Sequence, residues 1–308
     1  MPRAKRTLIS QEEGSYHIIS RINKKHTLFD EVEKEYLFNL LSLFASGFYV
    51  QIHAYSIMST HFHILVTTQD IEAKEASGEE LLRRYRLMYG ERANPPTGSA
   101  KTYGCFKVDE DGGIERLRNR LGSISRFVQE LKQTFSTWYN KRHGLKGYLW
   151  HDRFKGIVLD KGEAQLVCSA YIDLNPVRAD LVRRPEHYRW SSLGLRLRDA
   201  KQADELLIHC EGDLPWYRQF VYSCGGVERE GKHKIDPHII DEVIKVQGRL
   251  GIGERLRYRV KNISEGMAIG SHSFISEIQR RYNRKFIRPR PFFNTNLLFS
   301  TRVLKAKR

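Results

Sequence analysis

Two histidines, His61 and His63, stand on either side of a phenylalanine in "HFHILVTT" (61–68), a stretch whose composition predicts a buried β-strand. Because side chains alternate across a strand, both imidazoles project from the same face. Two neutral imidazoles side by side can chelate one divalent cation. The chain has 12 histidines, however, so such a pair can also arise by chance, with both rings satisfied by cross-strand hydrogen bonds.

A second pair of polar side chains lies in "SAYIDLNPVRADLV" (169–182). Tyr171 and Asn175 stand at i and i+4 of a predicted helix, so the phenol and the carboxamide face the same way. If this helix lies near the open face of the sheet, Asn175 can supply a third metal ligand beside the histidines, with Tyr171 one turn away. Alternatively, Tyr171 simply packs with Val167 and Leu174, and the residues alone leave both interpretations open.

The elements that must position these residues follow from hydrophobic periodicity and from turn signals. The order is strand, helix, strand, strand, helix, strand, which is the ferredoxin-like pattern. We therefore expect an α+β fold with an RRM-like antiparallel sheet. The expected elements are a strand at 15–22, a helix at 29–47 with a capping box at Asp30 and Glu33, strands at 48–58 and 61–68, a helix at 123–142, a strand within 147–160, and a helix from Gly162 that Pro176 ends at Asn175.

Two segments lie outside this pattern. Residues 70 to about 118 lose periodicity and contain "ERANPPTGSAKTYG" and "DEDGG", so we expect an insertion that leaves the core. Beyond residue 195 the composition turns polar, with helical patterns near 238–249 and 273–283. We expect a catalytic domain at 1–195 and a small, mostly helical extension at 196–308 that could bind DNA.

Charge points to a polyanionic partner. The 52 Lys and Arg against 36 Asp and Glu give a formal net charge of +16, which favours nucleic acid, although the charge could also serve solubility alone. Tyr139, Tyr148 and Trp150 are candidate stacking platforms for unpaired bases, or ordinary core aromatics. The basic side chains expected to follow a phosphate backbone are Arg126, Lys132, Lys141, Arg142, Arg153, Lys155 and Arg178.

Cysteine usage and hydropathy bear on the compartment. The four cysteines form no C-x-x-C pair, and the basic N-terminal residues are followed by no apolar signal region. No apolar run approaches the roughly 20 residues that a membrane-spanning helix needs. We therefore expect a reduced, cytoplasmic protein with no membrane partner.

Four ordered blocks give the sequence a resemblance to a known family. They are "YHIISRINKKHTLF", "HAYSIMSTHFHIL", "FSTWYNKRHGLKGYLWHDRFKG" and "AYIDLNPVRADLVRRPEHYRWSS". Together they resemble the REP-associated tyrosine transposases, which belong to the HUH single-tyrosine transposase superfamily of small insertion sequences. The resemblance covers residues 15 to about 192, and the segment 70–118 and the C-terminal extension depart from the compact family pattern.

The resemblance implies a function for each candidate residue. His61, His63 and Asn175 would bind Mg²⁺ or Mn²⁺ at the scissile phosphate, and Tyr171 aligns with the nucleophile that forms a 5′-phosphotyrosine. The implied partner is single-stranded DNA with REP-like hairpins, and the implied setting is a bacterial cytoplasm, at the nucleoid, as a monomer or a homodimer. Two other interpretations remain open: a replication-initiator or relaxase-type nicking enzyme, and a non-catalytic or domesticated hairpin-binding protein.

Overall fold

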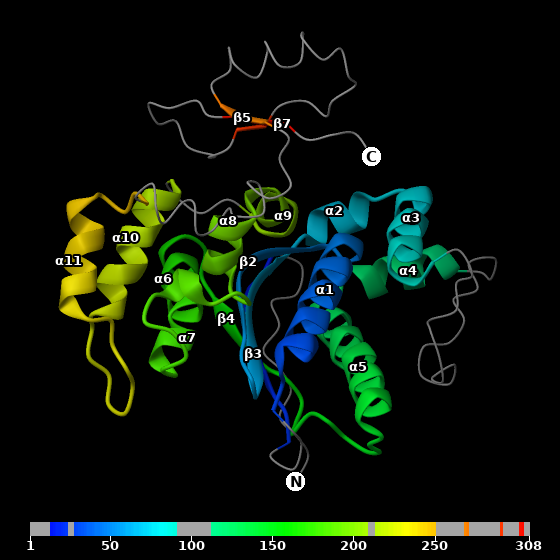
Figure 1. Cartoon of the computed structure of the whole chain (residues 1–308). Helices are drawn as coiled ribbons and strands as arrows, with labels where there is room; N and C mark the ends of the chain where they lie inside the picture. Colours follow the sequence, from blue (N-terminus) through cyan, green and yellow to red (C-terminus); the bar gives the residue numbers. More distant parts are fainter. Residues whose placement is uncertain are drawn as a thin grey trace.

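The computed structural model has the expected α+β fold, and it describes residues 13–23, 28–90, 112–208 and 213–250 together with three short strands near the C-terminus. A four-stranded sheet lies at the centre with helices on both faces (Figure 1). The sheet contains β1 (Ser15–Arg21), β2 (Val50–Ile57), β3 (His61–Thr68) and β4 (Lys155–Leu159). The helices that flank it are α1 (Glu31–Gly47), α2 (Asp70–Glu75), α3 (Gly78–Tyr89), α4 (Gly113–Leu121), α5 (Ile124–His143), α6 (Glu163–Asp173) and α7 (Asn175–Arg178).

The strand order confirms the ferredoxin-like topology. The sheet runs β2-β3-β1-β4, and every neighbouring pair is antiparallel. In the register, Ile19 pairs with His63 and Arg21 pairs with His61, so the two histidines lie beside the central strand β1. A bulge in β2 between Ile52 and Ala54 adds His53 to the strand. Bulges of this kind re-aim a side chain.

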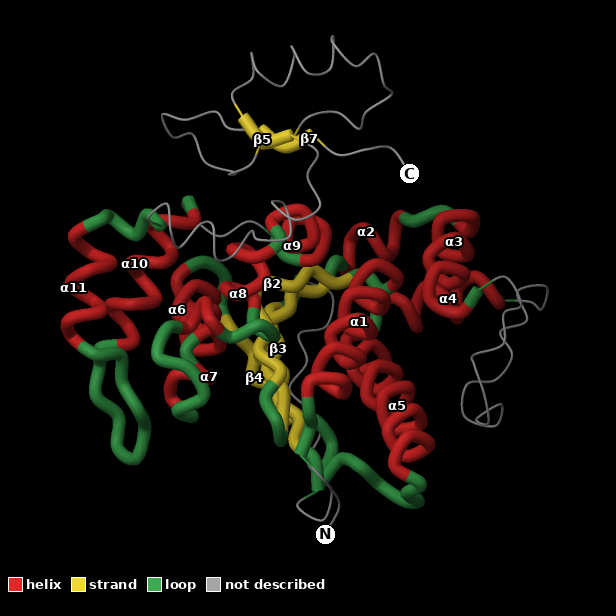
Figure 2. The backbone as a smooth tube through the Cα atoms, viewed as in Figure 1, coloured by secondary structure: helices red, strands yellow, loops and turns green. Residues whose placement is uncertain are grey.

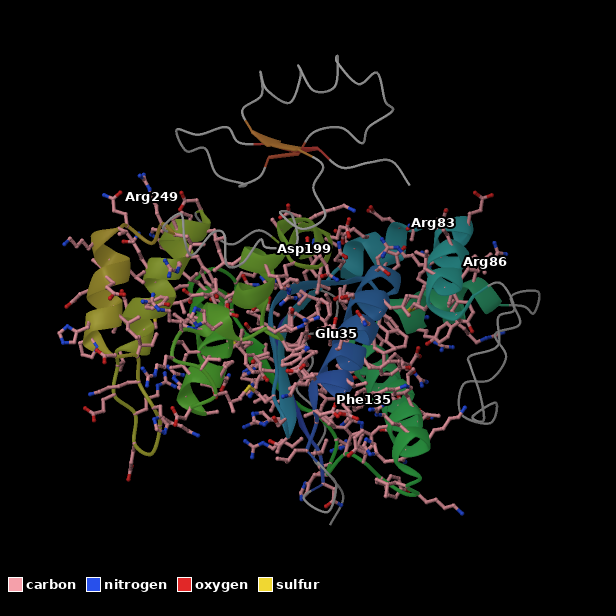
Figure 3. The ribbon with its side chains drawn as sticks, in the orientation of Figure 1. Glu35, Arg83, Arg86, Phe135, Asp199 and Arg249 are labelled. Atoms are coloured by element: carbon pink, nitrogen blue, oxygen red, sulfur yellow. The ribbon has the colours of Figure 1, made fainter. Side chains whose placement is uncertain are left out.

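One face of the sheet is closed by an apolar core. Ile18, Phe62 and Ile64 are buried there with Phe135, whose position on α5 is labelled in Figure 3. The helices α1 and α5 cover this face together (Figure 1). Helix α1 begins with the predicted capping box, since Asp30 accepts from the Glu33 backbone and Glu33 accepts from the Asp30 backbone. This face provides most of the large aromatic burial of the molecule.

The opposite face is covered by α6, which packs on β2 and β3. A second buried cluster then joins α6 to later helices through Leu174, Leu193, Tyr217 and Val221. In Figure 2 these helices form the layer on the far side of the sheet from α1 and α5. The later elements are the 3₁₀ turn η1 (Pro185–His187) and the helices α8 (Ser192–Arg198), α9 (Ala200–Leu206), α10 (Leu214–Gly225) and α11 (Pro237–Lys245).

The prediction that residues 70–118 leave the core is wrong for their described parts. Helices α2, α3 and α4 pack beside α1 and α5, and Leu81, Tyr85 and Leu117 belong to the main buried cluster. Leu81, Tyr85 and Met88 recur at helical spacing within α3. The segment between Gly90 and Gly112 separates α3 from α4 in the sequence, so the helical pattern is interrupted. Short helices that bury only one side give a weak periodic signal, so the turn-rich composition dominated the prediction.

The C-terminal extension is helical in its first part, as expected, and α11 corresponds to the helix predicted near 238–249. The buried cluster that contains Leu193 and Val221 crosses residue 195, so the expected boundary there does not separate two cores in the described residues. Three short antiparallel strands, β5 (Ala268–Gly270), β6 (Arg290–Pro291) and β7 (Arg302–Leu304), pair in the order β5-β7-β6, so the extension is not purely helical. The helix predicted at 273–283 lies outside the described residues. None of the described helices is long and apolar enough to cross a membrane.

Candidate active site

The two histidines of β3 lie on the face that α6 covers. His63 is buried and His61 is half-buried, and their ring centroids are 5.0 Å apart. The period of the strand places His17 of β1 on the same face, where its ring stacks on that of His63 at 5.1 Å between centroids. Phe62 points to the opposite, apolar face. The predicted orientation of the pair is therefore observed.

Each histidine uses Nδ1 for a hydrogen bond within the protein. Nδ1 of His63 lies 2.9 Å from Nε2 of His17, and Nδ1 of His61 lies 2.9 Å from Oγ1 of Thr60. In both rings Nε2 is then the nitrogen left to face a ligand. Metal-binding histidines commonly have their other ring nitrogen held in this way, because the second bond fixes the tautomer and the ring plane.

Burial sets the charge of these rings. It lowers the pKa of His61 to about 4, with a further contribution from the positive charges of Arg21 and Lys232. Burial also lowers the pKa of His63 to about 2, and the neighbouring His61, His17 and Arg21 act in the same direction. Both imidazoles are therefore neutral near pH 7. Neutral imidazole is the form that binds a metal ion.

Tyr171 reaches this pair from α6. Its ring centroid lies 5.8 Å from that of His17 and 6.0 Å from that of His63, nearly perpendicular to both rings. Tyr171 is half-buried, whereas the fully packed core tyrosines are not exposed at all. It does touch the small cluster around Ile172, so the packing interpretation also has a basis. The proximity to the histidines distinguishes it from an ordinary core residue.

Asn175 begins the short helix α7, one turn beyond Tyr171. The sequence predicted one helix ending at Asn175, but α6 ends at Asp173 and the chain resumes helical geometry at once. The side-chain Nδ2 of Asn175 donates to the Tyr171 carbonyl at 3.1 Å, which leaves Oδ1 to face other groups. The described residues contain no group of three or more His, Cys, Asp or Glu side chains that could hold a metal ion. A metal bound by the histidine pair would therefore need an amide oxygen or ligands from outside the protein.

Two polar anchors hold α6 in place, and sequence reasoning missed both. At its C-terminal end the buried Asp173 accepts from Ser192 Oγ at 2.6 Å, from the Leu193 backbone at 2.9 Å and from Tyr217 Oη at 2.7 Å. Burial raises the pKa of Asp173, while these hydrogen bonds oppose the rise. An acidic residue two positions after Tyr171 within an apolar run was the signal to follow, because such a residue must find partners when buried.

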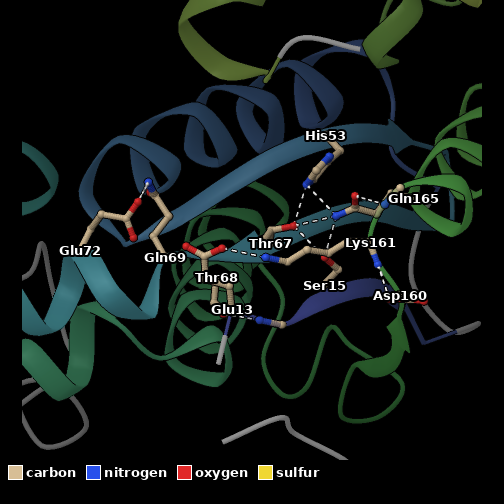
Figure 4. A network of polar contacts seen from close by, with 12 residues as sticks. Glu13, Ser15, His53, Thr67, Thr68, Gln69, Glu72, Asp160, Lys161 and Gln165 are labelled. Carbon is tan, nitrogen blue, oxygen red and sulfur yellow. Dashed lines mark hydrogen bonds and ion pairs between the residues drawn. The ribbon is translucent and has the colours of Figure 1, made fainter. Parts of the chain in front are cut away.

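The second anchor is Gln165 in the first turn of α6 (Figure 4). Its Nε2 donates to Ser15 Oγ at 2.7 Å and to Thr67 Oγ1 at 3.2 Å, and its Oε1 accepts from the Gly162 backbone at 3.0 Å. Nε2 of His53, the bulged residue of β2, lies 2.7 Å from the same Thr67 hydroxyl. This network ties three strands of the sheet to the start of the helix that carries Tyr171.

The predicted basic residues divide between the two faces of the sheet. Lys155 pairs with Ile19 in the register, so it lies on the histidine face, and the Arg178 guanidinium lies 5.3 Å from the Tyr171 ring. The α5 residues belong to the opposite face. There Lys132 is buried and donates to the Asp152 carbonyl at 2.9 Å, and Arg142 pairs with Glu33. The structure therefore does not bring all seven side chains to one surface; Arg126, Lys141 and Arg153 are exposed.

The three candidate stacking platforms also differ. Tyr139 is fully buried, and Trp150 donates its indole N–H to the Lys132 carbonyl at 2.9 Å. Tyr148 is 91% exposed, so of these three it alone presents its ring faces to solvent. Arg21, which the sequence did not single out, pairs with His61 in the register of β1 and β3 and so lies beside the histidine pair.

Comparison with known families bears on what this arrangement does. Residues 10–76 match the family model described as "Transposase IS200 like". The resemblance to these transposases is thereby confirmed for the segment that contains His17, His61 and His63, and it supports a DNA-processing enzyme. A solved structure described as a REP-associated tyrosine transposase bound to a REP hairpin is 14% identical, over 77% of this chain and 99% of that chain, with a TM-score of 0.41. No curated protein matches the sequence.

Proposed function

We propose that the protein is a metal-dependent, single-stranded DNA endonuclease and strand transferase in which Tyr171 is the nucleophile. The observation that carries the proposal is the position of the Tyr171 ring beside His63 and His17, on the only face of the central sheet that presents histidines in the described residues. A binding protein has no need for a phenol next to an imidazole pair. The family match over residues 10–76 supports the same class of chemistry.

Two neutral imidazoles and an amide oxygen form a donor set whose chemistry suits a divalent cation. Nε2 of His61, Nε2 of His63 and Oδ1 of Asn175 would hold Mg²⁺ or Mn²⁺, and Mn²⁺ is the tighter of the two for imidazole ligands. When bound, the ion supplies charge stabilisation at the phosphate as a Lewis acid. The protein's own contribution is to orient the ligands, through His17 on His63 and Thr60 on His61.

The reaction is an exchange of phosphodiester bonds. The Tyr171 oxygen attacks the phosphorus and loses its proton, the bond from phosphorus to the 3′ oxygen breaks, and that oxygen leaves as a 3′ hydroxyl. The product is a 5′-phosphotyrosine ester, which conserves the bond energy without ATP. A 3′ hydroxyl of another strand can reverse the step and complete strand transfer. Lys155 and Arg178, which lie on the histidine side, are proposed to contact the DNA backbone.

The proposed substrate is single-stranded DNA that carries a REP-like hairpin. This part of the proposal rests on the resemblance of the four sequence blocks to the REP-associated tyrosine transposases, which act on such hairpins. Because Tyr171 reaches the histidines of its own chain, a monomer holds every proposed catalytic group, although the resemblance also allows a homodimer.

The test is the covalent adduct itself. Purified protein is incubated with a labelled library of single-stranded hairpins and Mn²⁺ or Mg²⁺, and denaturing gels are used to look for protein–DNA adducts. We expect adducts with the wild type that are lost in Tyr171→Phe, in His61→Ala and in chelator. Tyr148→Phe is the matched control, since it removes a phenol from an exposed position. Tight binding without any adduct would instead support the non-catalytic hairpin-binding protein.

A further inference from the structure

The loop between α10 and α11, residues 226–236, belongs to the C-terminal extension yet reaches the candidate active site. In Figure 1 the loop extends from the ends of α10 and α11 and lies beside α7. Its Arg229 places a guanidinium 5.6 Å from the centre of the Tyr171 ring. Lys232, three residues further along the same loop, is also exposed. The extension therefore places the Arg229 guanidinium beside the proposed nucleophile and carries a second cation in the same loop.

The loop is held in this position at its base and at its side. The Ile235 backbone donates to the Gly225 carbonyl at 3.0 Å, and the Ile235 side chain is buried in the cluster that contains Tyr217 and Val221. His233 lies 3.6 Å from the carboxylate of Asp180, which follows α7. The Lys232 backbone donates to the Arg229 carbonyl at 3.1 Å and closes a turn that carries both cations. The placement of Arg229 is therefore a product of the fold.

Arg178 approaches the same phenol ring, at 5.3 Å. Its side chain is only 9% exposed, and its Nη1 is buried with no hydrogen-bond partner among the described residues. Burial lowers the pKa of Arg178, the nearby Arg229 lowers it further, and no carboxylate among the described residues opposes this effect. Burying a guanidinium with one nitrogen left without a hydrogen bond, next to a second cation, costs free energy. An anion bound between or beside the two guanidinium groups would offset this cost.

We propose that Arg178, Arg229 and Lys232 form a binding site for a phosphate of the DNA strand next to Tyr171. The inference rests on the proposed function and extends it, because it assigns part of the active site to the C-terminal extension. Guanidinium groups suit a phosphodiester because they donate several parallel hydrogen bonds to its oxygens. The guanidinium groups of Arg178 and Arg229 would also compensate the single negative charge of the phosphotyrosine diester after cleavage.

The experiment compares Arg229→Ala, Lys232→Ala and the double variant with Arg249→Ala. Arg249 is an exposed arginine of the same extension, labelled in Figure 3 away from the 226–236 loop, so its loss changes net charge equally. Adduct formation is followed at saturating hairpin, and DNA affinity is measured in chelator at several salt concentrations. Because Arg229 and Lys232 are exposed, thermal unfolding of all variants should match the wild type.

We expect the adduct rate to fall by about tenfold to a hundredfold in Arg229→Ala and further in the double variant, as charge-assisted hydrogen bonds to phosphate are lost. The slope of the logarithm of the binding constant against the logarithm of the salt concentration should become shallower by about 0.7 for each phosphate contact removed. Arg249→Ala should change neither quantity. Arg229→Lys should recover part of the rate because the charge is retained.

A further step locates the contacted phosphate. Once the cleavage position is mapped, the phosphates on either side are replaced one at a time by uncharged methylphosphonates. At the phosphate that Arg229 contacts, the replacement and Arg229→Ala should not add in their effects on affinity. Additivity at every position would overturn the inference.

Failure of this inference and failure of the proposed function give different experimental results. If the wild type forms adducts while Arg229→Ala and Lys232→Ala behave as Arg249→Ala does, the loop has no function in phosphate binding and only this inference is wrong. If the wild type forms no adduct with any hairpin, the proposed function is wrong and the inference falls with it.

Discussion

The two faces of the central sheet differ in their content of polar side chains, although a small apolar cluster with Ala54 and Leu65 also lies under α6. Toward α1 and α5 the strands present Ile18, Phe62 and Ile64 to a continuous apolar core. Toward α6 they present His17 and His63, together with hydroxyls, and each of these groups has a hydrogen-bond partner. The apolar face supplies stability through burial, whereas the polar face costs desolvation that its hydrogen bonds only offset. The chemistry of this protein is therefore expected on the face whose polar side chains are held by hydrogen bonds.

The largest effect on folding is expected on the apolar face. Phe62→Ala removes a fully buried ring next to both histidines and should lower the free energy of unfolding by about 3–5 kcal/mol. Ile157→Ala, at a 38% exposed position of the edge strand β4, should cost less than about 1 kcal/mol. Urea unfolding followed by circular dichroism measures both. Equal losses for the two variants would contradict the asymmetry between interior and edge.

A smaller but still substantial effect is expected where α6 ends. Asp173→Ala leaves Ser192, Tyr217 and the Leu193 backbone without their acceptor, and should cost about 2–4 kcal/mol. Tyr217→Phe removes one of these bonds and should cost about 1 kcal/mol. Because Asp173 positions the turn that carries Tyr171, adduct formation should fall in a folded Asp173→Asn variant, whereas Asp160→Asn, at an exposed position, should leave it unchanged. A drop in stability with full activity would show that the anchor has no bearing on the nucleophile.

Acid should weaken the histidine face selectively. Burial, with Arg196 nearby, lowers the pKa of His53 to about 4, against about 6.5 for the unfolded chain. The unfolded chain then binds more protons between these values, so the free energy of unfolding falls as pH falls from about 6.5 toward 4, by up to about 3 kcal/mol for this group. His53→Gln, which can still bond Thr67, should make that part of the profile less steep, while the other buried histidines keep the remaining slope. Urea titrations at a series of pH values measure the free energy of unfolding of both proteins. If its slope against pH is unchanged in the variant, the acid sensitivity belongs to other groups.

A weaker effect is expected at the start of α6. Gln165→Ala removes two donated bonds to the sheet and one bond accepted from Gly162, and should cost about 1–2 kcal/mol. The neighbouring Glu163→Ala, at an exposed position, is the matched control and should be nearly neutral. Thermal unfolding of both proteins gives the comparison. A neutral Gln165→Ala would mean that water replaces the network without loss.

No effect at all is expected from mixing two inactive variants. Because Tyr171 lies beside His63 of its own chain, Tyr171→Phe and His61→Ala proteins combined in one tube should form no adducts above the level of each alone. Recovered activity would show that the tyrosine of one chain acts with the histidines of another.

The fold could be predicted from the sequence where the signals were local. The capping box at Asp30, the paired strands around Ser59-Thr60 and the common face of His61 and His63 all follow from periodicity over a few residues. The site was less predictable, because its parts come from separate elements. His17 lies on β1, far from His63 in the sequence, yet its ring is the hydrogen-bond partner of His63. Lys132 was expected to meet DNA, yet it lies buried against Trp150.

The sequence by itself determined which side chains share a face of a strand or a helix, since backbone geometry repeats every two residues in one and every 3.6 in the other. It therefore determined that His61 points with His63, and that Tyr171 precedes Asn175 by one turn. Only the tertiary structure decided that α6 packs on the histidine face, and that the loop carrying Arg229 returns to the same phenol. Such contacts depend on which apolar surfaces find one another across the whole chain, and no local pattern records that choice.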